Sequence, residues 1–397
     1  MDKLLLLSVF YCVSSITADP FVWPPSYKRT PLGDSIDVST MKVLKATYEA
    51  AEDKNVVSSP LGLMTLLSLF NLGAGPETQA EITKFLGGTD ARKTSDLFKR
   101  LTLMYSELNP DHLTFADKIS VSNRYTLNKS FAADARDYLC EFDTLDFGKP
   151  AEAAAAINRW AAEKTKGHIT EPVSKDSLGP DVAAVLYNVI YFNGHWHVPF
   201  KAEETKDKDF HVSRDSVVKK PMMHLFQSLY YAESEQLGAK MIELPYKETG
   251  FRMVVVLPNE VDGLPSVLEK AAEKGLLSDV FRLSPAGCEV DLDMPKFEIN
   301  TKIDFNDILP KVGVSKMFAE FAPGIVNAPV KVSKAFQEAF IKVDEEGATA
   351  GAFTGLVMIT ISALSTPPPP MKFTVDHPFL YAILHEDKIL FAGTYSS

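Results

Sequence analysis

The feature that most restricts the fold is a set of short β-rich runs in the second half of the chain, at 182–192, 240–244, 251–257, 289–299, 340–343 and 373–375. Several are apolar at successive positions, as in Met-Val-Val-Val-Leu at 253–257, and such strands are buried on both faces. The first half instead has helical spacing, at 36–51, at 61–72 and around Ile157 and Trp160. The sequence therefore predicts one large α+β domain with helices early and strands late.

The N-terminus has the organisation of a secretory signal. A short polar start precedes an apolar run from Leu4 to Val13 and small residues up to Ala18, where we expect cleavage. Residues 19–33 contain four prolines and no period, which predicts an extended arm before a single domain at 34–397. We expect the mature protein to be secreted, because no other stretch approaches the ~18 apolar residues of a membrane helix.

Charge and motif content exclude several functions. The chain has 41 basic and 52 acidic residues and a net charge of −11, so a broad nucleic-acid or anionic-membrane footprint is not expected. It lacks the nucleophile elbow GxSxG, the zinc motif HExxH, paired CxxC and both common nucleotide-binding loops, so we predict neither an enzyme nor a cofactor. His195 and His197 would share one face of a strand, but no acid or thiol at ligand spacing accompanies them, and no metal site is predicted.

Two cysteines and one glycosylation sequon remain in the mature chain. Cys140 and Cys288 either pair or stay free, and the sequence leaves both alternatives open. Asn128 begins the sequon Asn-Lys-Ser and is predicted to carry a glycan if it is exposed in the secretory pathway. The core, rather than a disulfide framework, is expected to hold the fold together.

The stretch 344–370, DEEGATAGAFTGLVMITISALSTPPPP, is the most informative for function. After Gly347 it has no charged residue until Lys372. Alternate residues of a strand face the same way, and here the even positions are small: Ala348, Ala350, Ala352 and Thr354. One interpretation is a permanent central strand, but its glycines and four prolines disfavour that. The sharper hypothesis is a segment that is a loop in one state and a strand between two others in another state.

Eight segments, in order along the chain, resemble the serpins. They are NVVSSPLGL (55–63), LGAGPETQAEI (72–82), INRWAAEKTKGHI (157–169), NVIYFNGHWHVPF (188–200), IELPY (242–246), MPKFEI (294–299), VSKAFQEAFIKVDEEGATAGAFTG (332–355) and DHPFLYAIL (376–384). The resemblance implies a serpin fold of three β-sheets (A, B and C), about nine helices and an exposed reactive centre loop at about 345–371. It also implies a monomeric suicide inhibitor whose partner is a target protease of the serine or cysteine class.

The resemblance also assigns roles to individual residues. Lys296 and Glu345 match an ion pair where the loop enters the main sheet, and Trp196 matches a bulky residue beneath that opening. Asn188, Ser59 and Gln337 match a polar cluster at the midpoint of the sheet, although Gln337 replaces a histidine and Gly62 a serine. The implied hinge consists of Glu345, Glu346, Gly347, Ala348, Thr349, Ala350, Gly351 and Ala352.

The bond that a protease would cut is predicted by the family's usual spacing from the hinge. Counting from Glu345 gives Ile361–Ser362, whereas counting back from Val375 ends near Pro367, so the loop is longer than usual and Leu364–Ser365 is the fallback. Either bond presents an apolar side chain, which favours elastase-like or chymotrypsin-like serine proteases, or papain-like cysteine proteases. The alternatives are a non-inhibitory serpin that acts as a carrier, binding or storage protein, and a secreted hydrolase whose nucleophile and base are not identifiable.

Overall fold

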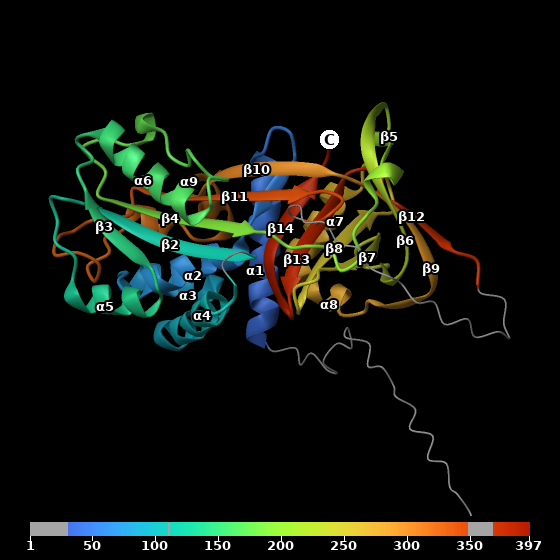
Figure 1. Ribbon diagram of the computed structural model, residues 1–397. Coiled ribbons are helices and arrows are strands. Elements are labelled where there is room, and N and C mark those ends of the chain that lie inside the picture. Colours follow the sequence, from blue (N-terminus) through green and yellow to red (C-terminus); the bar gives the residue numbers. More distant parts are fainter. Residues whose placement is uncertain (1–30, 110–111, 348–367) are drawn as a thin grey trace, which may run out of the picture.

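A computed structural model describes residues 31–109, 112–347 and 368–397 of the chain. A five-stranded and a nine-stranded sheet lie side by side, with the long helix α1 between them (Figure 1). Helix α6 covers one face of the five-stranded sheet, and α2 to α5 lie on the other side (Figure 1). The α-helices of the described residues are α1 (Pro31–Ala50), α2 (Pro60–Asn71), α3 (Pro76–Phe85), α4 (Ala91–Ser106), α5 (Lys129–Asp137), α6 (Pro150–Lys164), α7 (Leu264–Lys274), α8 (Leu277–Val280), α9 (Phe305–Ile308) and α10 (Lys316–Ala319).

The five-stranded sheet has the order β10-β11-β4-β2-β3. Its strands are β2 (Leu113–Ser122), β3 (Glu141–Leu145), β4 (Ala184–Phe192), β10 (Phe297–Asp304) and β11 (Lys334–Val343). The neighbours β11 and β4 are parallel, paired from Lys334–Val185 to Phe340–Tyr191, whereas β10 and β2 are antiparallel to them. Every residue of β4 is buried, as its sequence predicts, because all of its residues except Asn188 are apolar.

The nine-stranded sheet has the order β1-β14-β13-β8-β7-β6-β9-β12, with β5 attached to β6. Its strands are β1 (Val56–Ser58), β5 (Lys206–Ser213), β6 (Ser216–Ser234), β7 (Ala239–Pro245), β8 (Phe251–Pro258), β9 (Ser284–Pro295), β12 (Met371–Thr374), β13 (Phe379–His385) and β14 (Lys388–Tyr395). The resemblance implies three sheets, but hydrogen bonding forms two, because the 19-residue β6 pairs with β5, β7 and β9 and so joins two of them.

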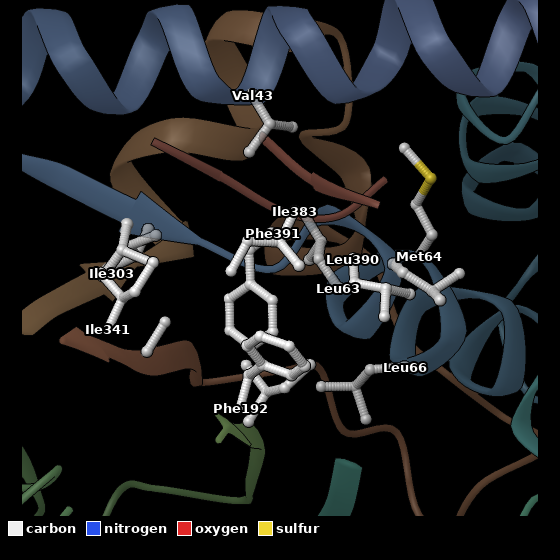
Figure 2. Close-up of a cluster of buried hydrophobic side chains, with 14 of the residues drawn as sticks. Val43, Leu63, Met64, Leu66, Phe192, Ile303, Ile341, Ile383, Leu390 and Phe391 are labelled. Atoms are coloured by element: carbon white, nitrogen blue, oxygen red, sulfur yellow. The ribbon is translucent and has the colours of Figure 1, made fainter. Parts of the chain in front are cut away.

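The main core lies where the two sheets meet α1 and α2. Figure 2 shows Val43 of α1, Leu63 of α2, Phe391 of β14 and Phe192 at the end of β4 in one cluster of buried side chains. All twelve residues of α2 are buried, which confirms the prediction of an interior helix. Burial of large apolar side chains is the dominant favourable term in folding, so this shared core fixes the end of β4 against the nine-stranded sheet.

Three local features differ from the sequence prediction or decide an open alternative. The first helix begins at Pro31 rather than after residue 33, because proline is favoured in the first turn, where its missing N–H is not needed. The run 289–299 is two strands in different sheets, and the chain crosses between them at Lys296. Cys140 and Cys288 are both free thiols, and burial raises the pKa of Cys140 well above its usual value.

Within the described part of the chain, no helix is both long enough and apolar enough to cross a bilayer. The predicted signal at 1–18 and most of the predicted arm lie outside the described residues.

Candidate functional site

The segment that precedes the predicted loop, residues 344–347, is held against the chain that follows β4. Residues 344–347 form a tight turn in which Asp344 and Gly347 exchange backbone hydrogen bonds of 3.1 and 3.3 Å. Gly347 forms an isolated antiparallel bridge with His195, and the backbone N–H of Trp196 donates to the carbonyl of Glu346 at 3.0 Å. We call residues 344–347 and 195–200 together the gate. Residues 345–347, the described part of the predicted hinge, therefore follow the end of β11 and lie beside the extension of β4.

Gly347 is the position in the gate where only glycine fits. Its φ of +128° lies in a region that residues with a side chain rarely adopt. A Cβ atom there would lie 2.2 Å from the carbonyl oxygen of Gly194. The glycine therefore permits the close approach of the two backbones.

Trp196 fills the space beneath the gate, as the resemblance implies. It is 3% exposed and stacks on Tyr246 with ring centroids 4.5 Å apart. Its indole N–H donates to the carbonyl of Asp344 at 2.8 Å. The ring thus packs on one side and holds the turn of the gate on the other.

The structure brings Lys296 and Glu345 together, with Nζ 3.1 Å from Oε1. Thr205, which the sequence did not single out, donates its hydroxyl to the same Oε1 at 2.7 Å. Burial raises the pKa of Glu345, but hydrogen bonds from Thr205, its own backbone and Lys296 outweigh this and lower it overall. Lys296 is 41% exposed, so the pair itself adds little stability.

The midpoint cluster consists of Ser59, Asn188, Gln337 and Asp117, and joins three strands to the start of α2. Gln337 of β11 accepts from the backbone N–H of Ser59 at 2.7 Å and donates to the Ser59 carbonyl at 2.9 Å. It also donates to Oδ1 of Asn188 on β4 at 2.8 Å. An amide can donate and accept at once, so Gln337 bridges the β11–β4 seam where the family usually has histidine.

Gly62, the other departure from the family pattern, makes room for the cluster. Ser59 caps α2 by accepting the backbone N–H of Gly62 at 3.3 Å. A Cβ at Gly62 would lie 2.4 Å from Oδ1 of Asn188. The missing side chain leaves the space that the Asn188 amide occupies.

Asp117 is the member of the midpoint cluster that sequence reasoning missed. It lies opposite Asn188 in the β2–β4 register, is 5% exposed and accepts from Asn188 Nδ2 at 2.9 Å. Burial raises the pKa of Asp117 to about 7, although the hydrogen bond from Asn188 opposes this. The sequence signal for Asp117 was weak: it is a charged residue within a strand, β2, whose following residues are all buried.

A cavity of about 690 Å³ lies between α6 and the half of the five-stranded sheet away from the gate. Phe336 and Gln337 of β11 and Lys302 of β10 line its sheet side, and Asn158 of α6 lines the other. The β11–β4 seam thus has the gate at one end, the midpoint cluster along it and open space beside the cluster.

The remaining predicted positions fall in two groups. Residues 348–352 of the hinge and both predicted bonds, Ile361–Ser362 and Leu364–Ser365, lie outside the described residues. Asn128 precedes α5, and its Nδ2 donates to the carbonyl of Pro323 at 3.1 Å, a hydrogen bond that a glycan on this nitrogen would have to alter.

Comparison with known proteins agrees with this architecture. The family profile described as "Serpin (serine protease inhibitor)" matches residues 35–397. Alaserpin of Manduca sexta is 33% identical over 98% of this chain and 99% of its own length. Antitrypsin of Bombyx mori is 34% identical over 90% of this chain and 92% of its own length. The chain belongs to the serpin family.

A solved structure gives the same result for the fold. Serpin48, described as a highly specific serpin in the insect Tenebrio molitor, is 30% identical with a TM-score of 0.81, covering 94% of this chain and 99% of that one. The serpin fold is thereby confirmed. Antichymotrypsin-2 of Bombyx mori, 33% identical over 90% of this chain and 96% of its own length, is another relative named as a protease inhibitor. These relatives support serpin-type protease inhibition and a non-enzymatic role.

Proposed function

We propose that this chain is a suicide inhibitor of proteases. A protease attacks the loop as a substrate and forms an acyl-enzyme, and the cut loop then inserts between β11 and β4 before water releases the protease. About 14 inserted residues at ~3.3 Å each would carry the attached protease roughly 46 Å. The trapped enzyme loses its active geometry.

The main support for this proposal is the position of Gly347, beside the seam between β11 and β4. The loop leaves from the end of β11 at the seam that it must open, and β11 pairs with β4 over only the stretch from Lys334 to Phe340 before the isolated contact at Gly347. A segment leaving here needs only to fold back to lie between the two strands. The small even-numbered residues 348–354 are suited to the narrow space.

The midpoint cluster opposes the separation of β11 from β4. Gln337 has to release Asn188 when β11 and β4 separate, because its 2.8 Å hydrogen bond crosses the seam. Polar groups left unpaired in a buried place cost about 1–3 kcal/mol each. This supports a native state kept short of its most stable arrangement by a barrier.

The target is proposed from the loop sequence. No Lys or Arg occurs between Gly347 and Lys372, so a protease that requires a basic residue before the cut has no site there. Ile361–Ser362, with Leu364–Ser365 as fallback, suits elastase-like or chymotrypsin-like serine proteases, or papain-like cysteine proteases. We also propose that the chain is secreted after cleavage near Ala18, works as a monomer and carries a glycan at Asn128.

The deciding experiment mixes the purified mature protein with elastase, chymotrypsin, trypsin and papain in turn. An inhibitor forms a complex that survives denaturing electrophoresis with at least one apolar-preferring protease, and sequencing the released C-terminal fragment identifies the bond. Cleavage without a complex, and without a gain in thermal stability, would instead favour a non-inhibitory serpin that binds or carries a ligand.

A variant of the loop separates insertion from recognition. Ala350→Arg places a large charge on the face proposed to insert, so we expect the loop to be cleaved while the complex is lost. Thr349→Arg, one residue earlier on the opposite face, is the matched control and should lose less inhibition. Equal loss in both variants would contradict the proposed alternation.

A further inference from the structure

Three metal-ligand side chains meet beside the gate from segments far apart in the sequence. His112 immediately precedes β2, His195 follows β4, and Glu248 lies in the turn between β7 and β8. One ligand atom from each lies within 4.8 Å of the other two. The sequence around His195 offers no acidic ligand at metal-binding spacing, but Glu248 of the nine-stranded sheet supplies one in the folded chain.

The two imidazoles converge on one carboxylate oxygen. Nδ1 of His195 lies 3.0 Å, and Nδ1 of His112 3.3 Å, from Oε1 of Glu248. Zinc bonds of about 2.0–2.1 Å at tetrahedral angles place neighbouring ligand atoms roughly 3.3 Å apart. Both nitrogen–oxygen separations are thus close to those of a metal site before any ion is bound.

The carboxylate is held in position by the backbone. Its second oxygen, Oε2, accepts the N–H of His195 at 3.0 Å, and the Glu248 side chain is only 11% exposed. Nδ1 of His112 also faces the carbonyl of Asn193 at 3.1 Å. Both nitrogens thus face oxygen atoms, and each would have to present its lone pair to a bound cation.

We propose that His112, His195 and Glu248 bind a divalent transition-metal ion, with Zn²⁺ as the natural probe. Two imidazole nitrogens and one carboxylate oxygen are a ligand set that zinc accepts, and its fourth position stays open to water. Hard cations such as Mg²⁺ prefer all-oxygen ligands and are not expected to compete.

The site is linked to the gate through His195. His195 forms the isolated β-bridge with Gly347. The carbonyl of His195 also accepts a hydrogen bond from the backbone N–H of Lys247, next to Glu248. A bound ion would tie the chain after β4 to the β7–β8 turn. Resting on the function proposed above, this predicts that Zn²⁺ slows loop insertion, because the gate must move for the loop to enter.

Isothermal titration of the mature protein with Zn²⁺ alone tests the site. We expect one ion per chain, no binding of Mg²⁺, and a Zn²⁺-dependent rise in the melting temperature, since a ligand that binds only the folded state stabilises it. Glu248→Gln retains an acceptor for the His195 N–H but loses the charge, and His112→Gln removes one imidazole. Each substitution should weaken Zn²⁺ binding by at least about 10–100-fold, because replacing a residue that only hydrogen-bonds to a metal ligand already has an effect of that size.

His197→Gln is the matched control, because this exposed histidine lies two residues from His195 and is not in the cluster. It should bind Zn²⁺ as the unaltered protein does. The proposal would be overturned if the unaltered protein did not bind Zn²⁺. It would also be overturned if the Glu248 and His112 variants bound Zn²⁺ with the same affinity as the unaltered protein. No protease enters this titration, so its failure is distinguishable from failure of the inhibitory function.

Discussion

Asp117 should make the stability of this protein fall as the pH rises. Burial lifts its pKa from 3.8 to about 7 in the folded state, so between these values the folded chain binds a proton that the unfolded chain has released. Stability decreases with pH wherever the folded state holds more protons. The contribution is fully present below about pH 4 and is lost as the pH rises to about 7.

The size of the effect follows from the shift. About three pKa units at 1.36 kcal/mol each give roughly 4 kcal/mol. An unfolding entropy of about 2.1 cal/mol/K per residue over roughly 360 residues converts this to about 5 °C in melting temperature. In Asp117→Asn, the amide oxygen still accepts from Asn188, but the titration is gone. Because the unfolded carboxyl is already largely ionised at pH 4.5, the variant should gain about 4 °C over the unaltered protein at pH 8 relative to their difference at pH 4.5.

The assay is thermal unfolding at one scan rate from pH 4.5 to 8, read as the difference between variant and parent at each pH. Asp146→Asn is the control, since it makes the same chemical change at an exposed carboxylate elsewhere in the chain. A difference between Asp117→Asn and the parent that is constant across this range would refute the reasoning, whatever its sign.

Three further predictions concern the gate and the cluster. Gly347→Ala should destabilise by about 1–3 kcal/mol in thermal unfolding, because alanine is strained at φ +128° and its Cβ meets backbone; an unchanged melting temperature would show that the turn relaxes freely. Gln337→Leu should cost about 2–4 kcal/mol in urea unfolding, because it leaves the N–H of Ser59 without its acceptor; a neutral result would remove the cluster as a barrier. Glu345→Gln should change stability by less than about 1 kcal/mol at pH 7 and flatten the loss of stability on acidification, since the pKa of Glu345 is lowered; equal acid sensitivity in urea unfolding would contradict this.

Residue positions that follow from local sequence were predictable. The hinge start, Trp196 and the Lys296–Glu345 pair lie in segments whose order and spacing are those of the family, and the structure brings them together as expected. The buried strand β4 was predictable because its residues are apolar on both faces except at Asn188.

Residues that join the site from distant strands were not predictable. Asp117 faces Asn188 only because β2 and β4 pair in one register, and Thr205 reaches Glu345 from a short turn before β5. Glu248 meets His195 across two sheets. Such contacts depend on strand register and on the packing of one sheet against another. Neither can be deduced from the residue spacing within a single segment. The joining of sheets by β6 was missed because Lys219, Lys220 and Pro221 interrupt its apolar residues, and proline is disfavoured in a strand.

The parallel alignment of β11 and β4 has a consequence for the energetics of the whole molecule. A segment that leaves the end of β11 and turns back runs opposite to both of its new neighbours. One parallel ladder, the slightly weaker kind per residue, would thus be exchanged for two antiparallel ones. Under the proposed function, the parallel direction of β11 and β4 would therefore favour insertion of a returning segment, because the sheet would gain backbone pairing of the more stable kind.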